Sequence, residues 1–259
     1  MGSAFVSGIL SKDVISKKNI YIVEPSLGIR RKLMGNGLTV FGSLNKINIT
    51  KLNINTVLLA VKPQIVNQVL MDLKTIINNE ISLISIVAGK NIEFYEKKLG
   101  IKNIIRAMPN TPARIGKGVT AIYAKPNVVK KYKKKLDKIF LAIGVILWLK
   151  KESDMDIVTA VSGSGPAYVF KFIESMINSA IKAGLNLKTA EIIVKNTLLG
   201  SSILANESIY SPKQLRKDVT SPGGTTEAAI KVLEKNNQFS KIIDLAIKSS
   251  IKRSIILSK

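Results

Sequence analysis

The chain has 259 residues, of which 46% are hydrophobic, so it can bury a sizeable core in one large or two modest domains. It has no cysteine and no histidine, which excludes disulfides, thiol nucleophiles and the commonest general base and metal ligand. The formal net charge is +23, but the lysines are spread along the whole length among Ile and Asn, which favours solvated surfaces over a nucleic-acid-binding face.

The first residues, "MGSAFVSGIL", combine small side chains with apolar ones at Met1, Phe5, Ile9 and Leu10. This spacing predicts an amphipathic helix with one closely packed face. In a dinucleotide-binding unit, a strand runs into G-x-G-x-x-G, and the last glycine opens such a helix. Gly2 fits that third glycine. The alternative is a chance helix of small residues.

Short β-branched runs alternate with helical or turn-like segments as far as residue 150, which predicts a doubly wound α/β sheet. The expected strands are "NIYIV", "NTVLLAV", "ISLISIV", "NIIRAM", "GVTAIYA" and "GVILWL". Glu24 follows the first of them, where an acidic residue can reach an adenosine ribose. The basic run at residues 130–138, "KKYKKKLDK", is typical of a solvated helix face, with nucleic-acid binding as the minority alternative.

Beyond "GVILWL" the pattern is helical to the end of the chain. Long apolar-periodic segments cover residues 165–184, 187–206, 223–236 and 239–257. Pro166 and Pro222 are plausible helix starts, and Gly184 and Asn206 are plausible helix stops. We therefore expect a dinucleotide-binding domain at residues 1–151 and an all-helical domain at residues 152–259, with the boundary near Glu152.

Three segments of the first domain are candidates for ligand contact. "AVKPQIV" leaves Lys62 at the carboxyl edge of the sheet, although a lone loop lysine is more often simply solvated. "IVAG" ends the next strand in small residues that a cofactor ring can approach. "RAMPNTPARIG" holds two proline turns around Asn110 and Thr111, either for structure alone or to present backbone groups.

Two stretches of the helical domain predict helix starts rich in free amides. "AVSGSGPAYVF" precedes one long helix, and "LRKDVTSPGGTTEAAI" precedes another. Amides and hydroxyls at a helix start favour an anion, so the pair suggests a small carboxylate held between them. Either stretch alone is more often ordinary capping.

These blocks resemble pyrroline-5-carboxylate reductases in their order and spacing. The motifs are "AVKPQ", "IRAMPNTPA", "VSGSGPAYVFKFIE" and "LRKDVTSPGGTTEAAIKVLE", the last being highly specific, and the resemblance runs from Met1 to about Leu257. It implies reduction of 1-pyrroline-5-carboxylate to L-proline with NADP or NAD, the last step of proline biosynthesis. It also implies an α/β Rossmann-type doubly wound sheet, here lacking its first strand, followed by an all-helical dimerisation domain, with a homodimer often assembled further into rings.

The resemblance also assigns residues. Gly224, Thr225 and Thr226 match the segment that holds the substrate, and Ser164 matches the pocket edge. Glu24 favours a free ribose hydroxyl, whereas Arg30 and Arg31 can accept a phosphate, so NAD and NADP both stay open. The cofactor-binding positions are Met1, Gly2, Asn45, Ala60, Val61, Lys62, Pro63, Val87, Ala88 and Gly89.

Other hypotheses have distinguishing features. A related hydroxyacid dehydrogenase would lack the Ser-Pro-Gly-Gly-Thr-Thr segment. A cofactor-deficient paralogue, acting as a basic scaffold or nucleic-acid-binding protein, would show a steep salt dependence in DNA binding. We expect no metal site. We also expect a cytoplasmic protein, because Lys or Asn interrupts every apolar run and the first residues lack a signal-peptide pattern.

The first prediction concerns the front of the chain. Because the first helix has no strand ahead of it, we expect a start assigned too late and codons that continue upstream in frame. They should encode a short apolar strand ending in Gly-x-Gly. Genomic sequence and the intact mass of the native protein check this expectation, and a stop codon directly before Met1 contradicts it.

Overall fold

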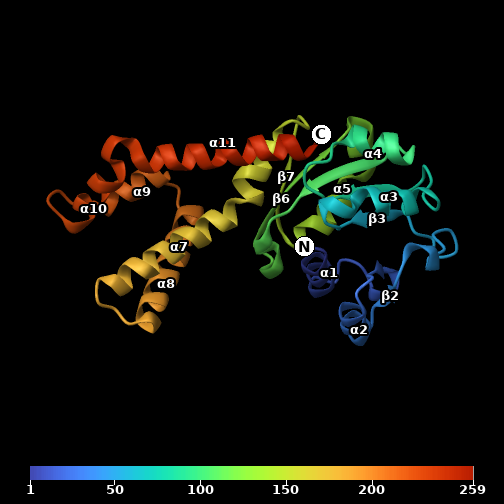
Figure 1. The fold of residues 1–259 in the computed structure, drawn as a ribbon, viewed down its shortest axis with the longest axis horizontal. Coiled ribbons are helices and arrows are strands. Elements are labelled where there is room, and N and C mark those ends of the chain that lie inside the picture. The colour runs from blue at the N-terminus through green and yellow to red at the C-terminus, as the bar shows by residue number, and fades with distance from the viewer. Residues whose placement is uncertain (259) are drawn as a thin grey trace. The chain divides into compact units, whose positions relative to one another are not determined.

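The computed structural model describes residues 1–258 (Figure 1). Its packing divides into two compact units. Unit 1 comprises Met1–Ser164 and the C-terminal residues from Ser250, and unit 2 is Gly165–Ser249. In the described part of the chain, no helix is both long and apolar enough to cross a bilayer.

Unit 1 contains two sheets. A five-stranded sheet has the order β3 (Thr56–Leu59), β4 (Ser82–Ser85), β5 (Ile104–Met108), β6 (Gly118–Ala124) and β7 (Gly144–Trp148). All neighbours are parallel except β5 and β6, which are antiparallel. A second sheet pairs β1 (Tyr21–Val23) with β2 (Thr39–Phe41) in parallel. The expected strands are thus confirmed, whereas the three-residue β2 was missed.

Helices cover both faces of the larger sheet, as its alternating side chains require. Leu83 of β4 packs against α3 (Val66–Lys74) and α4 (Ile92–Leu99), whereas the next residue, Ile84, packs against α1 (Gly2–Ser11) and α5 (Pro126–Leu141). On α5 the lysines are exposed and Tyr132 and Leu136 are buried, which confirms a solvated helix face.

The predicted opening helix is confirmed as α1. Ala4, Phe5 and Ile9 are its buried residues, and the ring of Phe5 meets that of Phe140 edge to face. A side chain at Gly8 would collide with Ile143, because its first carbon would lie 2.4 Å from a methyl group of that residue. The small residues therefore allow the close packing that their spacing predicted.

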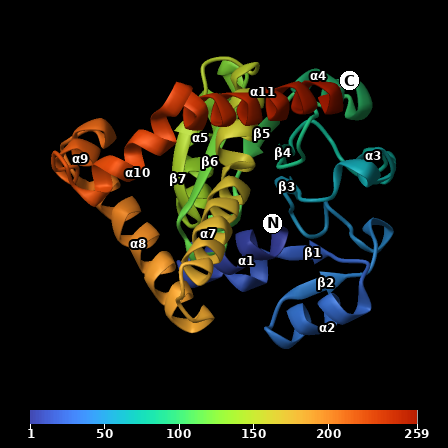
Figure 2. The same ribbon diagram turned by 60° about the vertical axis from the view of Figure 1, so that its left-hand side comes forward.

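The two sheets of unit 1 are not hydrogen-bonded to each other in the described structure, and Figure 2 shows β1 and β2 with α2 (Leu27–Gly35) apart from β3 and β4. In the classic doubly wound order, the position between β1 and β3 belongs to the strand that leads into the first glycines. Within residues 1–258, β1 and β3 therefore each keep one edge without a strand partner.

Residues 152–164 pack with unit 1, although the predicted domain boundary lies at Glu152. Met155 and Ala160 are buried there, in α6 (Asp154–Val158) and in the π-helical turn Thr159–Gly163. The compact units accordingly meet at Ser164, because side chains of this segment complete the cover of β5 and β6.

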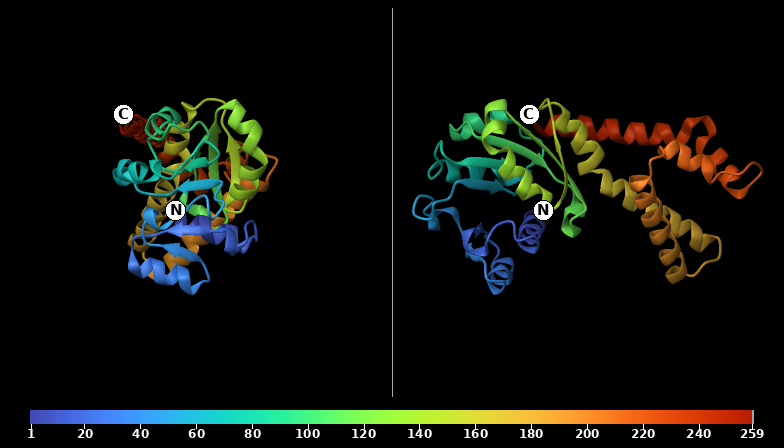
Figure 3. Two further views of the ribbon diagram at one scale, coloured as in Figure 1. Left: turned by 90° about the vertical axis from the view of Figure 1, so that its right-hand side faces the viewer. Right: turned by 180° about the vertical axis from the view of Figure 1, so that it is seen from behind.

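Unit 2 is helical, and the right-hand view of Figure 3 shows α7 (Gly165–Lys182) and α8 (Leu187–Glu207) as a hairpin. Gly184 closes α7 with a φ of 111°, and Asn186 caps α8. The remaining helices are α9 (Pro212–Asp218), α10 (Thr225–Glu234) and α11 (Gln238–Ser258), which continues into unit 1. The predicted helices exist, α9 was missed, and Pro222 lies in the turn before α10 rather than at its start.

Unit 2 has almost no core of its own. Within residues 165–249, all of which the structure describes, the buried side chains are those of Ala190 and Val194 alone. Large apolar side chains are exposed instead, including Phe170 (61%), Leu199 (59%) and Ile203 (47%). An apolar surface of this extent is typical of a helical unit that pairs with another copy.

We predict that α8 contributes to that pairing. Replacing both Leu199 and Ile203 by Ser should raise the dimer dissociation constant by at least about 100-fold, since burial of each such side chain is worth about 1.5–3 kcal/mol and a two-fold interface loses it twice. Analytical ultracentrifugation across a concentration series measures the change. Lys130→Ser, on the exposed face of α5 in unit 1, is the control and should leave the constant unchanged. A wild-type chain that stays monomeric at micromolar concentration contradicts pairing.

Candidate functional site

Most predicted cofactor positions of unit 1 meet at one edge of the larger sheet. Strands β3 and β4 are parallel neighbours, with Leu59 opposite Ser85, so the segments that follow them leave the same carboxyl edge. Gly2, at the start of α1, also lies there, because a side-chain carbon at Gly2 would be 3.3 Å from that of Ala60. The structure thus brings Gly2, residues 60–63 and residues 87–89 together.

The start of α1 suits an anion. No side chain of residues 1–258 caps this end, and its first turn holds no acidic residue. The first amides of a helix have no acceptor within the helix, and the helix dipole adds partial positive charge. With Gly2 open to close approach, this end can bind a phosphate group through its backbone.

The segment after β3 has the predicted form. Lys62 is extended, at φ −68° and ψ 145°, and Pro63 opens a short 3₁₀ turn, Pro63–Ile65. Val61 is half-buried, whereas Ala60 and Lys62 are exposed. The Lys62 side chain therefore points to solvent, and the backbone of this segment faces the sheet edge.

The segment after β4 is more constrained. Gly89 is buried with a φ of 77°, and a side-chain carbon there would lie 2.9 Å from the carbonyl oxygen of Leu257 in α11. Val87 is buried, and Ala88 packs on the cluster of Met108 and Met155. Both the backbone conformation and the available space therefore require glycine at position 89.

The smaller sheet carries the predicted adenosine-side groups. The Glu24 carboxylate accepts a hydrogen bond of 2.8 Å from the Ser26 amide, and the Arg30 guanidinium lies over Gly42, just after β2. Arg31 is exposed, as is Asn45, which accepts a hydrogen bond from Ser43. This end of β1 and β2 therefore offers an acceptor for a ribose hydroxyl and a cation for a phosphate.

The "MPNTPA" turn is tied in two directions by Asn110, which is buried. Its side-chain oxygen accepts from the Val119 amide at 2.9 Å, and its side-chain nitrogen donates to the Ser162 hydroxyl at 3.2 Å. Asn110 therefore links β6 to the π-helical turn, which supports the predicted stiffness of this segment.

One sequence prediction holds only in part. Helix α7 begins at Gly165 with Pro166 in its first turn, as predicted, but the stretch before it is not a free loop, because residues 154–163 are already helical. The Ser164 amide donates to the Thr159 carbonyl at 2.8 Å, so it is not available to an anion. Pro166 cannot donate to a preceding carbonyl, and the wider π turn directly before it accommodates that break. The Ser164 hydroxyl lies 3.2 Å from that of Ser250.

The second predicted helix start is present in unit 2. Gly224 is the N-cap of α10, no side chain in the described chain caps it, and Thr225 and Thr226 form its first turn. The neighbouring Glu227 carboxylate accepts from the Gly223 amide at 3.0 Å and pairs with Lys231 at 3.1 Å. The Gly223 hydrogen bond and then Lys231 lower the pKa of Glu227, which stays ionised with its charge compensated.

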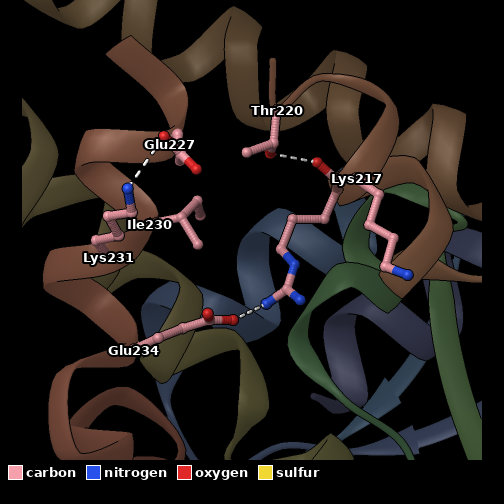
Figure 4. A pocket seen from close by; sticks show the side chains of 7 residues that line it. Lys217, Thr220, Glu227, Ile230, Lys231 and Glu234 are labelled. Carbon is pink, nitrogen blue, oxygen red and sulfur yellow. Dashed lines mark hydrogen bonds and ion pairs between the residues drawn. The ribbon is translucent and has the colours of Figure 1, made fainter. Parts of the chain in front are cut away.

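A shallow pocket lies beside this segment, between α9 and α10 (Figure 4). Glu227 and Lys231 face it from α10, and Arg216 pairs with Glu234 across it. Neither Thr225 nor Thr226 is among its lining residues, which are Arg216, Lys217, Thr220, Glu227, Ile230, Lys231 and Glu234. The pocket is therefore distinct from the predicted substrate-holding turn.

Sequence reasoning missed a polar cluster beneath the segment after β4. The Ser85 and Tyr95 hydroxyls share a hydrogen bond of 2.6 Å, and the buried Arg106 pairs with Glu152 at 2.8 Å. Burial raises the pKa of Tyr95 to about 12. The hydrogen bond with Ser85 and the positive charge of Arg106 both lower this pKa, but by less than burial raises it. The partners come from separate elements, so no local spacing predicts the cluster.

Comparison with known proteins agrees with this arrangement. Residues 152–257 match the family model for pyrroline-5-carboxylate reductase dimerisation. A pyrroline-5-carboxylate reductase from Synechocystis is 38% identical, over 100% of this chain and 95% of the relative. This chain belongs to the pyrroline-5-carboxylate reductase family. The alternative of a related dehydrogenase family is therefore not favoured.

Solved structures of the family have the same fold. The Plasmodium falciparum pyrroline carboxylate reductase, solved with NADP bound, is 34% identical with a TM-score of 0.88. The Coxiella burnetii pyrroline-5-carboxylate reductase is 35% identical with a TM-score of 0.89. Each match covers 100% of this chain and 95% of the other. The predicted Rossmann-type fold followed by a helical dimerisation domain is confirmed.

The raised pKa of Tyr95 predicts a loss of stability in alkali. Below pH 10 Tyr95 is neutral in both the folded and the unfolded chain; between pH 10 and about 12 it ionises only in the unfolded chain. From pH 9 to 11 the wild type should therefore lose about 1 kcal/mol more free energy of unfolding than Tyr95→Phe. Urea unfolding at both pH values measures the difference, and parallel losses contradict the assignment.

Proposed function

We propose that the chain reduces 1-pyrroline-5-carboxylate to L-proline with NAD(P)H, the final step of proline biosynthesis. The observation that carries this proposal is the start of α10 at Thr225 and Thr226, which no described side chain caps and which lies within the family's most specific sequence block. A small carboxylate suits free amides at a helix start. The family's members are named for this reaction.

The residues of unit 1 fit a nicotinamide dinucleotide. The uncapped α1 beside Gly2 and Ala60 would hold the pyrophosphate. The backbones of residues 60–63 and 87–89 would line the nicotinamide, with Gly89 allowing the positive φ and the close approach of Leu257 that this loop requires. Glu24 and Arg30 would face the adenosine ribose, with Asn45 nearby. When bound, the reduced cofactor supplies the hydride.

The remaining chemistry needs positioning rather than a protein nucleophile. Reduction places a hydride on the imine carbon and leaves a proton on the ring nitrogen, and a protonated C=N bond is already polarised. We assign the Thr226 hydroxyl to orient that nitrogen and the Thr225 and Thr226 amides to hold the carboxylate. Glu227 does not repel the carboxylate strongly, because Lys231 and the Gly223 amide compensate its charge. Orientation alone can supply a large part of the rate.

We propose the cytoplasm as the working compartment and a homodimer as the basic assembly, with dimers joined further into a ring. The dimer is supported by the match to a dimerisation model and by the exposed apolar side chains of α7 and α8. Exposed apolar residues also occur on α10 and α11, which is the support for assembly beyond the dimer. The mass from light scattering tests the ring.

The role of Thr226 is tested in a form of the enzyme that binds NAD(P)H. Thr226→Ala should lower kcat/KM for 1-pyrroline-5-carboxylate by roughly ten- to a hundred-fold, because a hydrogen bond to a charged group is lost. The Kd for NAD(P)H should stay nearly unchanged. Steady-state kinetics and cofactor titration measure both.

Thr226→Ser is the matched control, since it keeps the hydroxyl and should retain most of the activity. If Thr226→Ala keeps full activity, or loses it only through weaker cofactor binding, the assignment to the substrate is wrong.

A further inference from the structure

The loop at residues 86–91 joins β4 to α4 and contains three of the predicted cofactor positions. Its first half is fixed from below, since the Val87 amide donates to the Ser85 hydroxyl at 3.2 Å and Ser85 is itself bonded to Tyr95. Its back is covered by Leu257, which leaves no space for a side chain at Gly89. The loop is therefore held at its first half and at its back.

The far end is held by a residue distant in sequence. The Ile92 amide, in the first turn of α4, donates to Oε1 of Glu152 at 2.8 Å. Asn91 caps another amide of this turn, since its side-chain oxygen accepts from Phe94 at 2.9 Å. The acceptor for Ile92 thus comes from a segment 60 positions later in the chain.

Glu152 is in turn held by Arg106. The same Oε1 lies 2.8 Å from Nη1 of Arg106, whose side chain is only 8% exposed. Arg106 lies opposite Ser85 in the register of β5 with β4. A buried guanidinium requires a partner, so the pair fixes the Glu152 carboxylate at one place beside the start of α4.

We propose that Glu152 is a positioning residue for the cofactor: through the Ile92 amide it sets where loop 86–91 lies at the sheet edge. This inference rests on the proposed function, because it gives the loop a nicotinamide to line. Glu152 is also the first residue matched by the dimerisation model, so it ties the nicotinamide loop to the chain entering that domain.

The test separates the Ile92 hydrogen bond from the ion pair. Two double variants both remove the Arg106 charge, so neither leaves a lone buried charge. Arg106→Met with Glu152→Gln keeps an acceptor for Ile92, whereas Arg106→Met with Glu152→Met has a similar side-chain volume and no strong acceptor. The full-length chain is titrated with NADPH by fluorescence, and amide exchange at Ile92 is followed without cofactor.

The Glu152→Met double variant should bind NADPH about tenfold more weakly than the Glu152→Gln one, with faster exchange at Ile92 and KM for the imine within about twofold. Equal NADPH affinities overturn the inference. Glu96→Gln is the control and should leave affinity unchanged. Glu96 lies on α4, as Ile92 does, but it pairs with Lys125 at the start of α5, away from the loop. If a double variant does not fold, the single variants Glu152→Gln and Glu152→Met replace the pair, since both leave Arg106 equally uncompensated and differ only in the acceptor for Ile92. Tenfold weaker NADPH binding by Glu152→Met than by Glu152→Gln supports the role of Glu152, and equal affinities oppose it.

A failure of the proposed function gives a different result. A wild-type chain that binds no NADPH or reduces no 1-pyrroline-5-carboxylate contradicts the proposed activity itself. If the wild-type enzyme is active but the two double variants bind NADPH equally well, only the role of Glu152 is contradicted.

Discussion

Burial of β4 and β5 on both faces is the constraint from which the rest of unit 1 follows. Every residue of these two strands is buried, so side chains cannot carry chemistry there except in fully paired form. The polar exceptions are all paired: Ser82 with Thr56 and the Asn55 carbonyl, Ser85 with Tyr95, and Arg106 with Glu152. Ligand contacts are thereby confined to the carboxyl ends of the strands, where the backbone is free and the segments after β3 and β4 leave side by side.

Unit 2 is organised by the opposite condition. Its helices bury Ala190 and Val194 within residues 165–249, while aromatic and aliphatic side chains along α7 and α8 remain exposed. The proposed substrate turn at Gly224 is therefore built on an element that gains little stability from its own unit. The match of residues 152–257 to a dimerisation model fits this condition, because a second copy of the chain can supply the missing apolar contacts. The stability of the proposed substrate turn then depends on the free energy of dimer formation.

The sequence predicted what depends on local pattern and missed what depends on distant partners. Strand composition located β1 and β3 to β7, and small residues located α1. The three-residue β2 is too short to show a periodicity. Helix α9, by contrast, had a signal in the sequence: Ser211 directly before Pro212 is a typical helix start, and in the structure Ser211 caps the helix by accepting from the Gln214 amide. The antiparallel step from β5 to β6 was also readable, because the connection is too short for a crossover helix. By contrast, Arg106 and Glu152 are 46 positions apart and carry no local signature.

The packing of Leu257 behind Gly89 has a consequence for the order in which the chain is made. Unit 1 is discontinuous, and its last part, which also bonds Ser254 to Asp156 at 2.6 Å, is synthesised after the whole of unit 2. A nascent chain can therefore form the sheet early, but loop 86–91 gains its cover only when the ribosome has translated the final turns of α11. A premature stop near the end would damage the nucleotide-binding unit while leaving most of the helical unit translated.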